Sequence, residues 1–149
     1  MIRGSPSHLD LTVRDPARSV PFYERVLGWL GYEAVPELAG GAPCWIVRDS
    51  DGDAFGIALV AARPESGAPP HDRYAPGFHH FAFHADSREE VDAFHEFLQE
   101  IGARILDPPA EYDYTPGYYA LFFADPDGLK LELVHEPALR PSRRPAPTR

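Results

Sequence analysis

Two histidines and one glutamate have the side-chain types and positions that a divalent metal site requires. His8 and His80 each stand at the start of a short segment that alternates apolar and polar residues, and Glu132 lies inside a third such segment. This alternation is the period of a half-buried strand, with the apolar residues on one face. All three side chains fall on the opposite face. Two imidazoles and a carboxylate on one face form a recognised ligand set for a divalent metal with open coordination positions.

The two histidines are equivalent because the chain resembles itself at a spacing of 72 residues. Each half predicts one strand, one helix and then three strands, with an Asp-Gly turn before the last strand. The first repeat covers about residues 7–62 and the second about 78–136, joined by a proline-bearing linker around residues 61–77. The pattern predicts an α+β fold in which two βαβββ repeats form curved mixed sheets around a concave site.

Local signals give the bounds of the two helices. Asp15 and Pro16 predict the start of the first helix, with a kink or a later start at Pro21 and an end at Gly28. The second helix is expected to be capped within residues 86–90 and to end at Gly102.

Composition and charge restrict the class of protein. The 149 residues, 44% apolar and 25% charged, fit one globular domain over residues 1–136. No apolar run approaches the ~20 residues of a membrane span, no secretory signal opens the chain, and Cys44 is the only cysteine, so we expect a cytoplasmic protein. Residues 137–149 hold four prolines and four arginines, which predicts a flexible tail.

The net charge argues against two kinds of partner. It is −9 for the whole chain, and −13 over residues 1–136, where ten basic residues stand against 23 acidic ones. Such a surplus of negative charge repels phosphate backbones and anionic membranes. We therefore expect no nucleic-acid partner and no membrane partner.

Four segments together have the pattern of a known family: Ser7-His-Leu-Asp-Leu-Thr-Val13, Ser19-Val-Pro-Phe-Tyr-Glu-Arg-Val-Leu-Gly28, Gly77-Phe-His-His-Phe-Ala-Phe83 and Phe123-Ala-Asp-Pro-Asp-Gly-Leu-Lys-Leu-Glu-Leu133. Over about residues 6–136 the chain resembles the vicinal oxygen chelate superfamily, which includes glyoxalase I, fosfomycin resistance proteins, extradiol dioxygenases and bleomycin resistance proteins. The resemblance implies paired βαβββ units that usually assemble as a homodimer. It also implies metal ligation by His8, His80 and Glu132.

Departures from the family pattern limit which activity the resemblance implies. Glyoxalase-like members have a fourth ligand, Glu or Gln, where this chain has Gly56 or Ala58. A three-ligand site is therefore expected, as in the fosfomycin-modifying and extradiol branches. The extradiol branch, however, has other residues at the positions of Tyr119 and Phe122, and the fosfomycin branch has Thr at the position of Asp10. Neither specific activity can be assigned.

Further side chains are candidates to act on a substrate. His84 shares the predicted strand face of His80 and is a candidate proton carrier or a pocket wall, whereas His79 is expected to face the other way. Tyr119 is a second catalytic candidate. The candidates for substrate binding are Trp45, Arg48, Tyr112, Tyr114 and Tyr118. The alternatives are aromatic packing in a surface loop for the tyrosines and a solvated salt bridge for Arg48.

The leading hypothesis is a metal-dependent enzyme that uses one Fe, Mn, Ni or Zn ion. It would act on a small oxygen-bearing substrate, by Lewis-acid stabilisation of an oxyanion or enolate or by dioxygen activation. The alternative is a metal-free protein that sequesters a small molecule or antibiotic, as bleomycin resistance proteins do. A third, weaker hypothesis is an interaction module that uses the basic tail.

Overall fold

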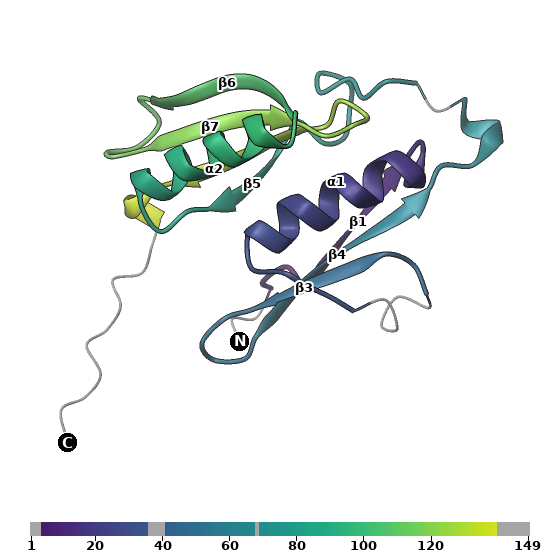
Figure 1. The fold of residues 1–149 in the computed structure, drawn as a ribbon, viewed down its shortest axis with the longest axis horizontal. Coiled ribbons are helices and arrows are strands. Elements are labelled where there is room, and N and C mark those ends of the chain that lie inside the picture. The colour runs from purple at the N-terminus through teal and green to yellow at the C-terminus, as the bar shows by residue number, and fades with distance from the viewer. Residues whose placement is uncertain (1–3, 36–40, 68, 140–149) are drawn as a thin grey trace. The chain divides into compact units, whose positions relative to one another are not determined.

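Two compact units, residues 1–71 and 72–149, make up the chain in this computed structural model. The structure describes residues 4–35, 41–67 and 69–139. Each unit has one long helix lying on one face of a four-stranded mixed sheet (Figure 1). Pro137–Leu139, the first residues of the expected tail, form a short 3-10 helix, and the rest of that tail lies outside the described residues.

The first unit follows the predicted order of strand, helix and three strands. Its elements are β1 (His8–Val13), α1 (Pro16–Trp29), β2 (Glu33–Ala34), β3 (Cys44–Arg48) and β4 (Ala54–Ala61), followed by a 3-10 turn, η2 (Pro64–Ser66). The strands are ordered β1-β4-β3-β2 across the sheet. β1 pairs with β4 in parallel, and the other pairs are antiparallel.

The second unit has the same topology. Its elements are β5 (Phe81–His84), α2 (Arg88–Glu100), β6 (Arg104–Glu111), β7 (Tyr119–Ala124), β8 (Lys130–His135) and the 3-10 turn η3 (Pro137–Leu139). The sheet order is β5-β8-β7-β6, with β5 parallel to β8. The α+β architecture of two repeat-like halves, predicted from the spacing of 72 residues, is confirmed.

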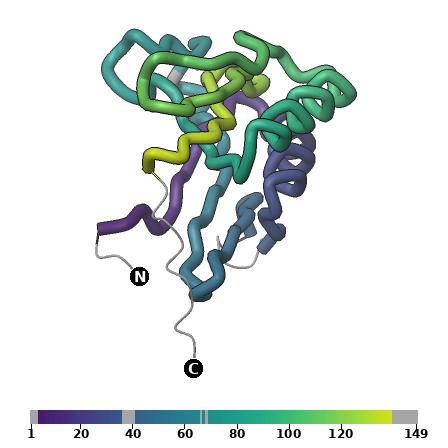
Figure 2. Tube along the Cα trace, turned by 90° about the vertical axis from the view of Figure 1, so that its left-hand side faces the viewer, coloured from purple at the N-terminus to yellow at the C-terminus, as the bar shows by residue number. Residues whose placement is uncertain are grey.

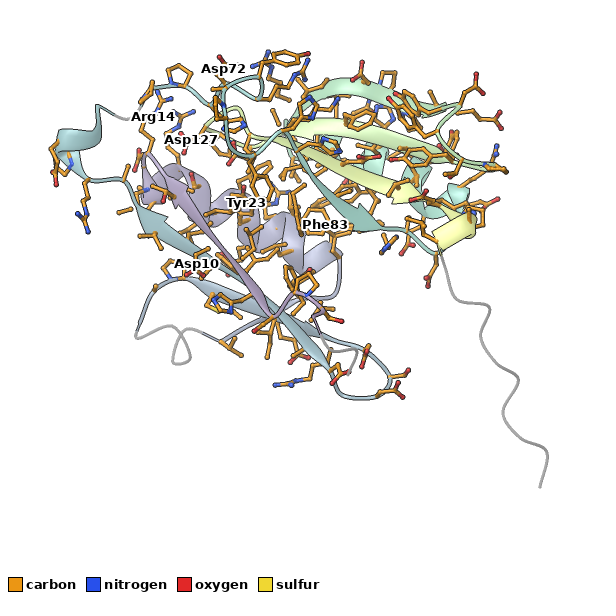
Figure 3. The ribbon with its side chains drawn as sticks, turned by 180° about the vertical axis from the view of Figure 1, so that it is seen from behind. Asp10, Arg14, Tyr23, Asp72, Phe83 and Asp127 are labelled. Atoms are coloured by element: carbon orange, nitrogen blue, oxygen red, sulfur yellow. The ribbon has the colours of Figure 1, made fainter. Side chains whose placement is uncertain are left out.

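Strand alternation separates a core face from an open face in each sheet. In the second unit α2 buries Phe94 against Phe123 of β7, with ring centroids 5.4 Å apart. Leu131 and Leu133 of β8 are fully buried on this same face. In the first unit Tyr23 of α1, labelled in Figure 3, is fully buried together with the apolar residues Val13, Val26, Leu27, Ile57 and Leu59.

The helix limits agree with the sequence in α2 and differ in α1. The Ser87 hydroxyl accepts a hydrogen bond from the Glu90 amide at 3.2 Å, and Gly102, with φ of 68°, follows the end of α2, as predicted. In α1 the later start, one of the two alternatives expected at Pro21, is wrong, since the helix begins at Pro16 and continues through Pro21. The end predicted at Gly28 is also wrong, and the left-handed glycine that follows the helix is Gly31, with φ of 84°.

Strand β6 is longer than the segment 104–106 that the sequence predicts. It continues to Glu111 through Pro108 and Pro109. The strand lies at the edge of its sheet, and its register with β7 shifts twice. Proline is tolerated at an edge or a bulge because it has no amide proton to donate to a neighbouring strand. The β6–β7 hairpin is the closed green loop of Figure 2.

Candidate metal and substrate site

Glu132 is a buried carboxylate in the middle of β8, and both of its oxygens have partners. The strand register pairs it with Ala82 on one side and Phe122 on the other, on the sheet face opposite α2. Its side chain is 1% exposed. The Tyr118 hydroxyl donates a hydrogen bond to Oε1, and His80 Nε2 lies 3.1 Å from Oε2. The structure thus brings together three of the residues singled out in the sequence.

This environment favours neutral forms of the carboxylate and the imidazole. Burial raises the pKa of Glu132, although the hydrogen bond from Tyr118 opposes that shift. Burial also lowers the pKa of His80, and the positive charges of Lys130 and Arg73 lower it further. The pKa of the Tyr118 hydroxyl is raised, first by burial and then by its bond to Glu132. Tyr118 therefore stays a hydrogen-bond donor.

His79 contacts His80, which the sequence does not predict. The two Nδ1 atoms lie 2.7 Å apart, so one ring donates and the other accepts. The expectation that His79 faces the opposite way is wrong because β5 begins at Phe81, so strand alternation does not govern the two histidines before it. His79 is positioned to fix the orientation of His80 and leave Nε2 directed at Glu132.

An aromatic cluster borders Glu132. Tyr112 and Tyr114 stack with centroids 5.6 Å apart and planes within 3°, and the edge of Tyr118 meets both rings. Phe122 lies edge-on to Tyr112 at 5.4 Å and to His80 at 6.2 Å. A cavity of about 310 Å³ is lined by residues 111–118. The three tyrosines thus form one wall beside the carboxylate.

The loop that carries these tyrosines is tied down at several points. The Tyr112 amide donates to the Tyr118 carbonyl at 3.2 Å, closing the loop. The Thr115 hydroxyl donates to Glu136 at 2.9 Å. These bonds hold the tyrosine wall in place relative to β8.

Lys130 adds a cation on the same face of β8 as Glu132. Its ammonium lies 3.6 Å from the centroid of Phe122 and 3.8 Å from Asp107 Oδ2. Sequence reasoning did not single out this lysine, although its place two residues before Glu132 was a usable signal.

Of the two catalytic candidates, one shares the face of Glu132 and one does not. His84 pairs with Val134, two residues beyond Glu132, so its side chain is on the open face. Tyr119 lies on the helix side, where its hydroxyl donates to Asp92 of α2 at 2.8 Å and Arg88 lies 5.0 Å from its ring. The structure therefore separates Tyr119 from the Glu132 face.

In the first unit His8 stands on the open face of its sheet. Its Cα partner is Gly56, and a Cβ built at Gly56 would lie 3.5 Å from both His8 Cβ and Ile46 Cγ2. His8 and Asp10 are both exposed on this face, whereas the intervening Leu9 faces the other way. His8 is therefore available to bind a ligand from the open side of its sheet.

Arg48 and Trp45 occupy opposite faces of β3. Arg48 pairs with Ala54, which puts it on the face of His8, and it helps line a cavity of about 400 Å³ with Ser7 and Asp53. Trp45 pairs with Ile57 and is 4% exposed, so it belongs to the core. The structure thus leaves Arg48, but not Trp45, on the open face.

The donor types fit a divalent cation, although the described residues do not form a complete site. Among them, no group of three or more His, Cys, Asp or Glu side chains is arranged to hold a metal ion. His80 Nε2 and Glu132 Oε2 are nonetheless two donors of the kinds that Zn, Fe, Mn and Ni accept.

No helix in the described part of the chain combines the length and apolar character of a membrane span.

Two known proteins and one solved structure are similar to this chain over most of its length. Uncharacterized protein YqjT of Bacillus subtilis is 35% identical over 85% of this chain and 95% of its own length. The 2-epi-5-epi-valiolone epimerase of an Actinomyces species is 34% identical over 93% of this chain and 86% of its own length. A solved structure from Bacillus halodurans, whose glyoxalase assignment is provisional, is 29% identical with a TM-score of 0.73, covering 90% of this chain and 97% of that one.

The family model of the Glyoxalase/Bleomycin resistance protein/Dioxygenase superfamily matches residues 5–133. That span includes both βαβββ repeats up to β8, together with His8, His80 and Glu132. The chain belongs to the Glyoxalase/Bleomycin resistance protein/Dioxygenase superfamily.

Proposed function

We propose that the protein is a metal-dependent enzyme that acts on a small oxygen-bearing organic substrate, with His8, His80 and Glu132 as ligands of one Fe, Mn, Ni or Zn ion. The observation that carries this proposal is the 3.1 Å approach of His80 Nε2 to the buried Glu132 Oε2. A buried carboxylate with a raised pKa lacks sufficient positive charge around it, and a divalent cation would supply that charge.

A metal held by these residues would serve as a Lewis acid toward a carbonyl or other oxygen of the substrate. The chain's own groups supply the rest of the chemistry. Tyr118 and His79 hold the ligands in orientation, and Tyr112 and Tyr114 line the cavity beside them. His84, on the same face as Glu132, carries a proton to or from the substrate.

Within this scheme we favour proton transfer at a carbon next to a carbonyl. The Actinomyces relative, 34% identical over most of this chain, is named as an epimerase of 2-epi-5-epi-valiolone. An epimerase inverts one carbon centre, and next to a carbonyl such inversion proceeds by removal and return of a proton. An electrophile on the carbonyl oxygen and a proton carrier nearby are the two requirements of that reaction.

The second candidate is metal-free sequestration of a small molecule. The observation that favours it is the cavity of about 310 Å³ beside Tyr112, Tyr114 and Tyr118, whose rings suit an aromatic or cyclic ligand. The buried Glu132 counts against it, because sequestration gives no reason to keep a carboxylate out of water.

The test compares chelator-treated protein with protein reloaded with Mn, Ni, Zn or, without oxygen, Fe(II). Hydroxyketones, beginning with 2-epi-5-epi-valiolone, are incubated in D₂O, and exchange of the proton next to the carbonyl is followed by NMR. We expect exchange that depends on metal and falls at least about tenfold in H84Q. Tight ligand binding in chelator, without metal-dependent exchange of any hydroxyketone, would favour sequestration.

A further inference from the structure

The cavity of about 310 Å³ at the β6–β7 hairpin (Figure 2) is lined by aromatic rings and by carboxylates. Tyr112, Tyr114 and Tyr118 supply the rings, and Glu111 and Asp113 supply the acids. Among these described lining residues there is no lysine or arginine. All of them belong to the second unit, and the volume suits a small molecule.

The three rings lie in two perpendicular orientations. Tyr112 and Tyr114 are parallel within 3°, with centroids 5.6 Å apart, and the plane of Tyr118 stands at 83° to the first and 85° to the second. The face of a tyrosine ring carries partial negative charge, so a cation placed over it is attracted. Tyr114 is 68% exposed, which leaves its side chain accessible to a ligand from solvent.

The charged groups at this cavity are mainly carboxylates. Glu136 is 8% exposed and accepts a hydrogen bond from Thr115, which lines the cavity. Asp113 is exposed and forms no ion pair with any residue that the structure describes. Arg88 offsets one charge of the lining, through its ion pair with Glu111. The chain itself therefore balances the negative charge at the cavity only in part.

The pKa of Tyr112 agrees with this distribution of charge. Burial raises the pKa of Tyr112, and the carboxylates of Asp107 and Glu132 raise it further. Carboxylates that disfavour a phenolate favour a cation beside the same ring. The ammonium of Lys130 lies 3.8 Å from Asp107 and 3.6 Å from the centroid of Phe122, so it balances part of this charge from outside the cavity lining.

We propose that this cavity binds the ammonium group of a small organic cation, held over the rings of Tyr114 and Tyr118 and balanced by Asp113 and Glu136. The inference rests on the proposed function only in identifying this cation as the substrate, an oxygen-bearing molecule that also carries an amine. The net charge of −9 agrees with it, because a negative field raises the local concentration of cations. A neutral compound of the same shape lacks the attraction to the ring faces and to the carboxylates.

The test compares a cation with a neutral molecule of nearly the same shape. Choline and its uncharged analogue dimethylbutanol, in which a carbon replaces the nitrogen, are titrated into the chelator-treated full chain by calorimetry at low and high salt. The variants are Y114L, which removes the exposed ring, Y114F, which keeps it, and D113N/E136Q, which removes two charges. Y74L and E96Q are the matched controls, at exposed positions that do not line the cavity.

We expect choline to bind at least about fivefold more tightly than its uncharged analogue, with an affinity that falls as salt rises. Y114L and D113N/E136Q should each weaken choline binding about three- to tenfold, whereas Y114F, Y74L and E96Q should change it less than about twofold. Equal affinity for the two compounds, no binding of choline, or unchanged choline binding in either Y114L or D113N/E136Q would overturn the inference.

These results are separate from those that test the proposed function. Choline binding is measured without metal, whereas the proposed function requires metal-dependent exchange of the proton next to a carbonyl. Failure of choline selectivity would leave that exchange standing. Absence of the exchange, with choline selectivity intact, would overturn the proposed function and leave the cation site.

Discussion

Glu132 is the residue on which the functional account depends. Its position on the open face follows from strand alternation, so the sequence alone places it correctly. Its partners do not follow from alternation, because Tyr118 belongs to a loop and His80 precedes its strand. The sequence predicts that Tyr118 binds the substrate, whereas in the structure its hydroxyl donates a hydrogen bond to Glu132.

Replacing Tyr118 by phenylalanine tests whether that hydroxyl supports the carboxylate as a ligand. Loss of the hydrogen bond raises the pKa of Glu132 further, so protons compete more strongly with the metal. We expect Y118F to weaken Ni²⁺ binding about 10- to 100-fold and to shift the pH midpoint of binding upward. Y114F is the matched control, since it removes a hydroxyl from the same cluster and leaves the Tyr118–Glu132 bond. Equal behaviour of the two variants would contradict this role.

The raised pKa of Glu132 also predicts how the stability of the metal-free protein depends on pH. The folded chain keeps a proton on Glu132 at pH values where the unfolded chain has released it. Stability from this group is therefore full below the ordinary carboxyl pKa of about 4.3 and is lost as pH rises through the raised folded pKa. Glutamine has no titratable carboxyl proton, so its contribution to stability does not change over this pH range.

We therefore expect E132Q to gain stability relative to the unaltered protein as pH rises from 4 to 7. Urea unfolding in the presence of chelator, followed by circular dichroism, measures the difference in free energy of unfolding. E96Q, at an exposed position of α2, is the control and should show a nearly constant difference. A difference in free energy of unfolding between E132Q and the unaltered protein that stays constant, or that shifts in favour of the unaltered protein as pH rises, would refute the burial argument.

At the scale of elements, the repeat makes most of the fold predictable. Both βαβββ units, the capping of α2 and the turn before β8 follow from periodicity and turn residues. The wrong predictions of element bounds occur where the tertiary structure tolerates a residue that is unfavourable locally. Pro108 and Pro109 obscure β6, because the sequence does not reveal that this strand lies at a sheet edge.

The same reasoning could place only some of the candidate site residues. Tyr119 and Trp45 are in strands, but the face that each presents depends on the register with its neighbours. Tyr119 meets α2, and Trp45 enters the core beside Ile57. A spacing of three residues between Trp45 and Arg48 was itself a signal that both cannot occupy one face of a strand.

Pro21 makes α1 less stable than its sequence otherwise allows. It lies inside the helix and has no amide proton to donate to the preceding turn. We expect P21A to raise the free energy of unfolding by about 2 kcal/mol, since the helix gain of about 3 kcal/mol exceeds the greater entropy of the unfolded alanine chain. P16A is the control, because proline is favourable at the first helical position and its replacement should give no gain. Chemical denaturation measures both, and equal effects would contradict the argument.

At the scale of the whole molecule, negative charge dominates, with −9 overall. A field of this sign opposes the approach of an anionic substrate. A divalent cation beside Glu132 would offset that repulsion locally. The charge pattern therefore agrees with metal-assisted binding better than with direct binding of anions.

The edge strands of the two sheets predict that the chain assembles with a second copy of itself. Each four-stranded sheet ends in two edge strands, β1 and β2 in one unit and β5 and β6 in the other. Open edges are usually covered or protected, and a second copy of the chain is one way to cover them. We expect a homodimer with twice the 16.6 kDa chain mass by light scattering after size exclusion. A concentration-independent mass of one chain would contradict this expectation.

Metal analysis of the unaltered protein and of E132A tests the central claim most directly. Both proteins are stripped with chelator, loaded with Mn, Ni or Zn, passed through a desalting column and analysed for metal per chain. The account predicts about one ion per chain in the unaltered protein and none retained in E132A, because the buried carboxylate is lost from the ligand set. Equal metal content in the two proteins would contradict the account.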